Sequence, residues 1–236
     1  MKFRCIYFRI LTLLMLVSSQ LLSQDRDPEG LLERVQNKFR TVMDYEAEVT
    51  IKVDVDFIKI PLKKGTIWYL QPDKIKVKTP GFALLPKRGM NFSPNQLFTG
   101  NYVTIYAREE KVGNVMTTVI KVIPQDEKDE IILSTLWIDP VRNVILRLES
   151  TTKTDGTFAM QFIYDPVAGK YDLPREIIFN FDLRKSELPI GLTGDFENSA
   201  PKEKGPKNTR GTVTINYVKY IINEGKGNAA FKTSKK

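Results

Sequence analysis

The sequence contains no histidine and a single cysteine among its 236 residues. Without histidine, Ser-His-Asp and Cys-His catalysis, histidine ligands for zinc or haem, and an imidazole switch near neutral pH are excluded. Glycine and proline, at 14 and 13 residues, are too few for a low-complexity chain, whereas 42% hydrophobic residues is typical of a globular protein. Lysine and arginine outnumber aspartate and glutamate by 36 to 28, which gives a formal net charge of +8.

Residues 1–23 have the pattern of a secretory signal peptide. A basic stretch ends at Arg9, residues 10–17 are almost wholly apolar, and serines follow up to Ser23. The apolar run is shorter than the ~20 residues that span a bilayer, although a retained N-terminal anchor is the alternative. We expect cleavage near Ser23 and export to the periplasm. Cleavage would remove the cysteine, Cys5, and lower the net charge from +8 to +5, so the mature chain would fold without disulfides.

One amphipathic helix is predicted between residues 27 and 44. Its apolar side chains recur every three or four residues, and Pro28 lies near its start, where proline is favoured. These apolar residues are Leu31, Leu32, Val35, Phe39, Val42 and Met43. The rest of the sequence shows no comparable period, so a mainly β (α+β) domain is expected over residues 24–224.

Alternation of apolar and polar residues begins at Tyr45 and predicts a long strand over residues 45–57 with one buried face. Turn residues such as Asp139-Pro140 and Asp155-Gly156 separate further segments of this kind. We therefore predict an antiparallel sheet of about ten or eleven strands. The other strand segments are 65–70, 73–79, 102–108, 112–123, 131–138, 144–151, 157–164, 176–183 and 212–222.

Two long connections and the C-terminus interrupt the strand pattern. Residues 80–101 carry large apolar side chains and are predicted to form a lid segment. Residues 186–210 are polar and rich in glycine, proline and lysine, which is typical of a mobile loop. Residues 225–236 are predicted to be a basic disordered tail.

A sheet of this size has more apolar surface than one helix can cover. Ten strands about 4.8 Å apart span about 45 to 50 Å, whereas a helix of about 17 residues shields about a third of that width. The remainder must be covered by curling of the sheet, by the lid segment or by a bound apolar ligand. An unclosed barrel with a cavity and a barrel filled by its own side chains both fit the pattern.

Four stretches of sequence carry a family resemblance. In chain order they read MDYEA at 43–47, GTIWYLQPDKI at 65–75, FTGNYVTIY at 98–106 and LWIDP at 136–140. Together they resemble the LolA/LolB-like outer membrane lipoprotein carrier superfamily, particularly its lipoprotein-sorting proteins. The resemblance implies an unclosed antiparallel β-barrel, with helices over its mouth and an apolar cavity that receives the acyl chains of lipoproteins.

The resemblance also implies site residues. The well-studied carriers have an arginine before the proline of the second stretch that latches the lid, and here this position is Gln71, the candidate gating residue. Glutamine retains hydrogen bonding but lacks the charge and the five donors of arginine. The candidate cavity residues are Phe39, Tyr45, Val49, Ile51, Val53, Ile67, Tyr69, Ile75, Val77, Leu84, Leu85, Phe92 and Phe98.

Together, these features predict a periplasmic carrier or chaperone that binds acyl chains of lipoproteins or other lipids and moves them toward the outer membrane. We expect a monomer that is not an enzyme and needs no cofactor or metal. Its partners would be an inner-membrane donor and an outer-membrane acceptor protein, and export disfavours nucleic acid. The alternative is a non-transporting envelope sensor or scaffold of the same fold, for which a small or filled cavity suffices. An exported hydrolase is the third possibility.

Other single features fit chemistry less well. The carboxylates of residues 126–130 lack the glycine and the ligand spacing of a calcium loop, so a solvated turn is preferred. Asp54 and Asp56 lack the partner that a glycosidase requires. Trp68 and Trp137 lie in apolar runs, which favours core or cavity packing over stacking on a sugar or base. The lysines of segment 74–78 suit an anionic membrane surface, but a solvated strand face explains them equally.

Overall fold

The structure is a computed structural model that describes residues 27–55, 58–59, 61–79, 100–154, 156–167, 169–184 and 208–232. Within these ranges the chain is mainly β, as predicted. Its elements are α2 (Pro28–Arg40), β1 (Asp44–Val55), β2 (Ile58–Lys59), β3 (Lys63–Leu70), β4 (Lys74–Lys78), β5 (Tyr102–Val112), β6 (Val115–Pro124), β7 (Ile131–Asp139), β8 (Val144–Thr152), β9 (Thr157–Ile163), β10 (Glu176–Arg184), β11 (Asn208–Ile222) and α5 (Lys226–Lys232).

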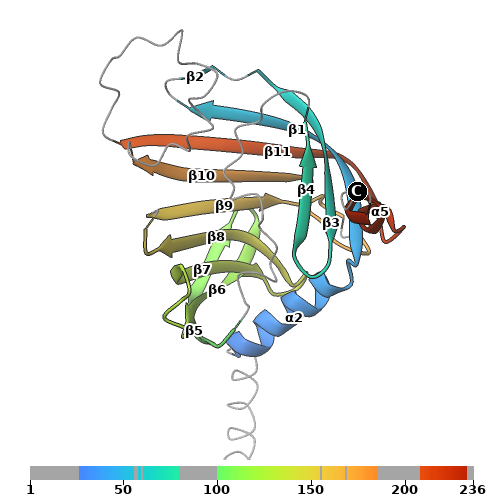
Figure 1. Ribbon diagram of the computed structural model, residues 1–236. Coiled ribbons are helices and arrows are strands. Elements are labelled where there is room, and N and C mark those ends of the chain that lie inside the picture. The colour runs from blue at the N-terminus through green and yellow to red at the C-terminus, as the bar shows by residue number, and fades with distance from the viewer. Residues whose placement is uncertain are drawn as a thin grey trace, which may run out of the picture.

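The strands form one antiparallel sheet in the order β4-β3-β1-β11-β10-β9-β8-β7-β6-β5, and β2 pairs with β1. The strand direction turns steadily from one edge to the other, so the sheet curls around one face (Figure 1). The end strands β4 and β5 are not paired with each other, so the sheet does not close. This confirms the predicted unclosed antiparallel barrel.

The inner face of the sheet, defined here as the face that packs against α2, carries a continuous apolar layer. Cross-strand neighbours on β6, β7, β8, β9, β10, β11 and β1 follow one another in register, and each is at most 8% exposed. This alternation of inward apolar residues is what the period of two predicted. In order, the row consists of Ile120, Leu136, Leu148, Met160, Phe179, Val213 and Val53.

Helix α2 crosses one end of this curved sheet (Figure 1). The carboxylate of Asp27 caps its N-terminus by accepting a hydrogen bond from the Gly30 N–H at 3.0 Å, and Pro28 occupies the first turn. Leu31, Leu32 and Val35 are buried against the sheet. The helix therefore covers part of the apolar inner face, as its sequence period predicts.

The C-terminal segment differs from the expectation. Residues 226–232, predicted to be disordered, form α5, because the buried Asp44 carboxylate accepts hydrogen bonds from the Gly227 N–H at 2.8 Å and the Gly225 N–H at 3.2 Å. A carboxylate at a helix N-terminus satisfies backbone donors that have no partner inside the helix. The sequence signal was weak, because Asp44 lies more than 180 positions from these donors.

Several predictions concern residues outside the described ranges. These are the signal peptide with its cleavage near Ser23, the lid residues Leu84, Leu85, Phe92 and Phe98, and most of the loop 186–210, whose last three residues belong to β11. Neither described helix combines the length and the apolar character that crossing a bilayer requires.

Candidate functional site

A cavity of about 80 Å³ lies between α2 and the inner face of the sheet. Its wall combines side chains of α2, of the strands and of the connection between β9 and β10. Small-molecule sites typically measure about 300–1,000 Å³, so the interior is largely filled by the protein itself. The lining residues are Val35, Lys38, Phe39, Tyr45, Tyr69, Ile75, Asn143, Val144, Ile145, Phe162, Tyr164, Tyr171, Asp172, Leu173, Pro174, Ile177, Tyr217 and Tyr220.

The candidate cavity residues fall into two groups. Phe39, Tyr45, Tyr69 and Ile75 line the cavity, and the last three are cross-strand neighbours on β1, β3 and β4. The others lie on the same inner face but pack into the core away from the cavity, namely Val49, Ile51, Val53, Ile67 and Val77.

Aromatic rings form the wall of the cavity opposite α2. The Tyr45 ring stacks on Tyr69 at 5.3 Å between centroids and meets the edge of Tyr220 at 5.4 Å. Phe39 of α2 contacts Tyr69 at 5.6 Å, which joins the helix to this cluster. Tyr217 stacks on Tyr220 at 5.0 Å. Offset and edge contacts of this kind stabilise aromatic pairs by about 0.5–1.5 kcal/mol beyond burial.

Sequence reasoning missed Tyr217 and Tyr220, although a signal was present. Apolar side chains on β11 occupy odd positions up to Tyr217 and even positions from Tyr220, so the alternation slips once. The structure has a β-bulge there, because Glu48 of β1 pairs with Lys219 and Val49 with Tyr217, which leaves Val218 unpaired. Bulges redirect side chains next to functional sites, and this one turns both rings inward.

The tyrosine hydroxyls of the wall are bonded to backbone carbonyls. Tyr220 donates to the Pro174 carbonyl at 2.8 Å, Tyr164 to the Ile145 carbonyl at 3.0 Å, and Tyr69 to the Pro72 carbonyl at 3.2 Å. Burial raises the pKa of Tyr45, Tyr164, Tyr217 and Tyr220, so these phenols are neutral at physiological pH. The wall is thus an uncharged aromatic surface.

Three charged residues meet at the side of the cavity. Asp172, with a side chain only 2% exposed, accepts hydrogen bonds from the Lys38 ammonium at 2.5 Å and from Arg142 Nη2 at 2.5 Å. Burial raises the pKa of Asp172, but the hydrogen bonds from Arg142 and Lys38 outweigh burial and lower it below its ordinary value. Lys38 belongs to α2, so this cluster ties the helix to the loops that follow β7 and β9.

Gln71 binds the end of α2. Its Nε2 donates hydrogen bonds to the carbonyls of Arg40 at 2.6 Å and Val42 at 2.9 Å, which lie at the last turn of the helix and just beyond it. The last carbonyls of a helix lack partners within the helix, and a side-chain donor satisfies them. The candidate gating residue therefore contacts the helix that covers the cavity.

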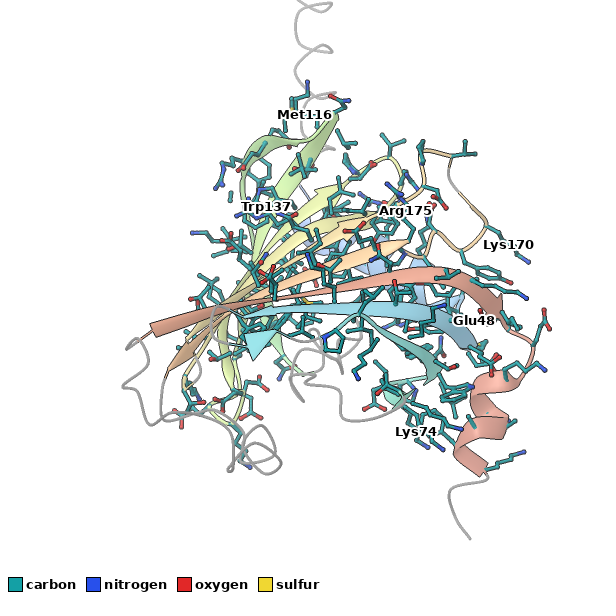
Figure 2. The ribbon with its side chains drawn as sticks, turned by 90° about the horizontal axis from the view of Figure 1, so that it is seen from above. Glu48, Lys74, Met116, Trp137, Lys170 and Arg175 are labelled. Carbon is teal, nitrogen blue, oxygen red and sulfur yellow. The ribbon has the colours of Figure 1, made fainter. Side chains whose placement is uncertain are left out.

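Both tryptophans lie on the outer face, so the expected core or cavity packing is wrong. Trp137 is 3% exposed, but the guanidinium groups of Arg147 and Arg108 cover it at 4.6 Å and 5.9 Å from the ring centre. Trp137, a residue of β7, is labelled in Figure 2. Trp68 donates a hydrogen bond to Glu46 at 2.6 Å. The apolar pattern predicted that core residues would bury Trp137. Arginine side chains on the outer face bury it instead.

The acidic segment 126–130 is a turn between β6 and β7. The Asp126 carboxylate accepts a hydrogen bond from the Lys128 N–H at 2.9 Å, as in an Asx-type turn, and this agrees with the predicted solvated turn. Within the part of the chain that the structure describes, no group of three Cys, Asp or Glu side chains is arranged to hold a metal ion.

No protein-family model matches the sequence, and no curated protein matches it either. Solved structures do match the fold. A DUF1329 family protein from Desulfovibrio piger aligns over 89% of this chain and 98% of its own, with a TM-score of 0.54 and 10% identity. A domain assigned to the outer membrane lipoprotein-sorting proteins of Vibrio parahaemolyticus aligns over 88% and 98%, with a TM-score of 0.50 and 12% identity.

A LolA superfamily protein from Nitrosomonas europaea aligns over 84% of this chain and 94% of its own, with a TM-score of 0.49 and 12% identity. At identities of 10% to 12%, the likeness concerns the fold. The fold expected from the four sequence stretches, that of the lipoprotein-sorting proteins, is therefore confirmed.

Proposed function

We propose that this chain, which has the LolA-like fold, is a periplasmic carrier that binds acyl chains of lipoproteins or other lipids between α2 and the inner face of its sheet. The observation that carries the proposal is the cavity beneath α2, whose aromatic wall continues into the apolar layer of the sheet. The name of the Vibrio parahaemolyticus relative in fold, a lipoprotein-sorting domain, supports lipid-modified cargo.

Cargo binding requires α2 to move, because the closed cavity of about 80 Å³ is too small for a long acyl chain. Exposing the three buried side chains Leu31, Leu32 and Val35 would cost about 1.5–3 kcal/mol each, or about 5–9 kcal/mol together. Burying a chain of about 15 methylenes at about 0.8 kcal/mol each would contribute about 12 kcal/mol. One long chain can therefore take the place of these three side chains while Lys38, near the end of α2, stays with Asp172, and the small surplus keeps binding reversible.

Reversible binding is what transfer between two membranes demands. A carrier that bound two or three chains in a rigid, open cavity would hold its cargo almost irreversibly. Here the helix competes with the cargo for the same apolar wall, which lowers the net affinity. The carrier would collect cargo from an inner-membrane donor protein and deliver it to an outer-membrane acceptor, acting as a monomer without covalent chemistry.

A non-transporting lipid- or protein-binding sensor of the same fold is the second candidate. The small cavity of the closed form favours it, because a sensor can work with an interior that its own side chains fill. The two functions differ in one measurable respect: a carrier releases its lipid to acceptor membranes, whereas a sensor retains it or binds none.

Mass spectrometry of organic extracts tests the proposal directly. Protein purified from its native envelope should carry acyl lipid, and Ile75→Asp, which places a carboxylate on the cavity wall, should lose it. Lys78→Asp is the matched control, because Lys78 is an exposed residue of the same strand, and this variant should retain lipid. Circular dichroism confirms that both variants fold. Absence of lipid from the unmodified protein, together with no binding of the neutral probe N-phenyl-1-naphthylamine, would overturn the carrier proposal.

A further inference from the structure

We infer that the cluster of Lys38, Arg142 and Asp172 at the side of the cavity selects an amphiphile whose head group is an anion, with the acyl chain beneath α2 and the head beside Lys38. This inference rests on the proposed function and narrows its ligand class to a single-chain carboxylate or phosphate amphiphile. The supporting observations are the free donor capacity of the cluster, its charge balance and its position between the cavity and solvent.

The donors of the cluster exceed its acceptors. An ammonium group has three N–H donors, and two of those on Lys38 bind Asp172 Oδ2 at 2.5 Å and the Arg142 carbonyl at 2.6 Å. The third is available to a ligand, and Lys38 lines the cavity. Asp172 has less capacity, since its carboxylate accepts hydrogen bonds from Lys38, from Arg142 and from the Gly169 N–H at 3.1 Å.

The charges of the cluster and its surroundings leave a positive excess. Lys38 and Arg142 share the single carboxylate of Asp172. Two carboxylates lie nearby: the charge of Asp139 also acts on Arg142, and Asp165 pairs with Arg175 at 3.8 Å. The guanidinium of Arg34 lies close by, donating to the neutral Asn143 at 3.3 Å. Lys38, Arg142 and Arg34 together therefore outnumber Asp172 and Asp139 by one positive charge, which favours an anionic ligand here.

The position of the cluster supports a ligand whose head group faces solvent and whose chain points into the cavity. The side chains of Lys38 and Arg142 are 25% and 21% exposed, whereas Asp172 beneath them is 2% exposed. Lys38 thus reaches from the cavity wall to solvent, while Phe39, Tyr69 and other apolar side chains lie on the inner side. A head group can remain hydrated beside the ammonium while its chain enters the apolar wall.

The inference is tested by comparing ligands of equal chain length and different head group. Dodecanoate and dodecanol displace N-phenyl-1-naphthylamine from the full chain at pH 7.5, and dodecanoate should bind about tenfold more tightly. Lys38→Met should remove this preference, so that this variant binds dodecanoate and dodecanol with equal affinity. Lys38→Arg should restore the preference for dodecanoate. Lys76→Met, which removes an outer-face lysine near α5, is the control and should keep the preference. Acetate and inorganic phosphate should not displace the probe, because they lack a chain.

Each outcome separates the inference from the proposed function. Equal affinities for dodecanoate and dodecanol, or a preference that survives in Lys38→Met, would overturn the anionic head group and leave acyl-chain binding intact. Probe displacement by inorganic phosphate alone would also overturn it, because the site would then bind free anions rather than amphiphiles. Binding of neither dodecyl compound would overturn the proposed function, and the inference with it.

Discussion

Tyr217 and Tyr220 lie three positions apart on β11, yet their rings stack with centroids 5.0 Å apart and planes only 8° from parallel. In a regular strand, residues three apart point to opposite faces. The bulge at Val218 adds one residue opposite Glu48, so that Val218 and Lys219 together occupy the place of one outward residue. The aromatic wall of the cavity therefore depends on a single extra residue in one strand.

Deletion of Val218 should be tolerated, because the ladder would become regular with Tyr217 and Tyr220 still inward. Their stack should open, since alternate residues of a regular strand are about 6.6 Å apart. Deletion of Thr212, well before the bulge, should damage the fold more, because it turns the buried Val213 and Ile215 outward before the bulge can absorb the missing residue. Urea denaturation gives the stabilities and near-ultraviolet circular dichroism the tyrosine stacking. Equal damage by the two deletions would contradict this account of the bulge.

Local sequence patterns predicted most of the fold. The alternation on β1, from Tyr45 to Val53, and the three-to-four spacing on α2 both report which side chains face the core, and each needs only neighbouring residues. Short turns predict that consecutive strands are antiparallel neighbours, which holds from β5 to β9 and for β3 with β4, but the pairing of β1 with β11 was not predicted. The cavity residues Tyr45, Tyr69 and Ile75 followed from the resemblance and this alternation together.

The charged part of the site could not be predicted in this way. Lys38 and Asp172 are 134 positions apart and neither belongs to a recognisable motif, so only the closed fold brings them together. For Trp137, the prediction of burial was correct but the predicted partners were wrong. Its apolar neighbours suggested burial in the core, but its burial comes from Arg108 and Arg147 on the outer face. Periodicity gives the degree of burial and not the partner that provides it.

Gln71→Ala should loosen the end of α2. The variant loses two hydrogen bonds to the carbonyls of Arg40 and Val42, each of which contributes about 0.5–1.5 kcal/mol. Hydrogen exchange in the last turn of α2 and the adjoining residues should accelerate by about tenfold. Gln125→Ala is the control, because the side-chain amide of Gln125 donates to the neighbouring carbonyls of Ile123 and Pro124, far from α2 in the sequence. If α2 exchanges at the same rate in both variants, Gln71 does not hold the helix.

The ion cluster should make stability depend on pH at the acid end. Burial raises the pKa of Asp172, but the hydrogen bonds from Arg142 and Lys38 lower it overall below its ordinary 3.8. A carboxyl whose folded pKa is lowered stabilises the fold above its unfolded pKa, and this contribution is lost as the pH falls through the folded pKa. The free energy of unfolding should therefore rise with pH up to about 4–5.

Asp172→Asn should flatten this acid limb and lower stability at pH 7, because two cations would lose their shared carboxylate. Asp165→Asn is the control, since Asp165 is 74% exposed and its pairing distance to Arg175 is 3.8 Å. Chemical denaturation at pH values from 3 to 7 provides the measurement. Parallel curves for Asp172→Asn and the unmodified protein would show that the pH dependence arises elsewhere.

Gly227→Ala should detach α5 from the sheet. A Cβ at residue 227 would lie 2.1 Å from the Tyr69 carbonyl oxygen and 2.9 Å from Asp44 Cβ, and the backbone oxygen cannot move without disturbing β3. The two Asp44 hydrogen bonds to Gly225 and Gly227 would break, leaving a buried carboxylate without its partners. Gly169→Ala is the matched control, because the space beside Gly169 is open.

Hydrogen exchange and limited proteolysis of residues 226–232 measure the detachment. Exchange there should approach that of an unfolded segment in Gly227→Ala. The core strands should exchange as before, because α5 lies at one edge of the sheet, beside β1, β3 and β4 (Figure 1). Asp44→Asn should weaken the same contact less, since the amide oxygen still accepts one hydrogen bond. Protection of α5 equal to that in Gly169→Ala would contradict the close approach of Gly227 to β3 and the capping role of Asp44.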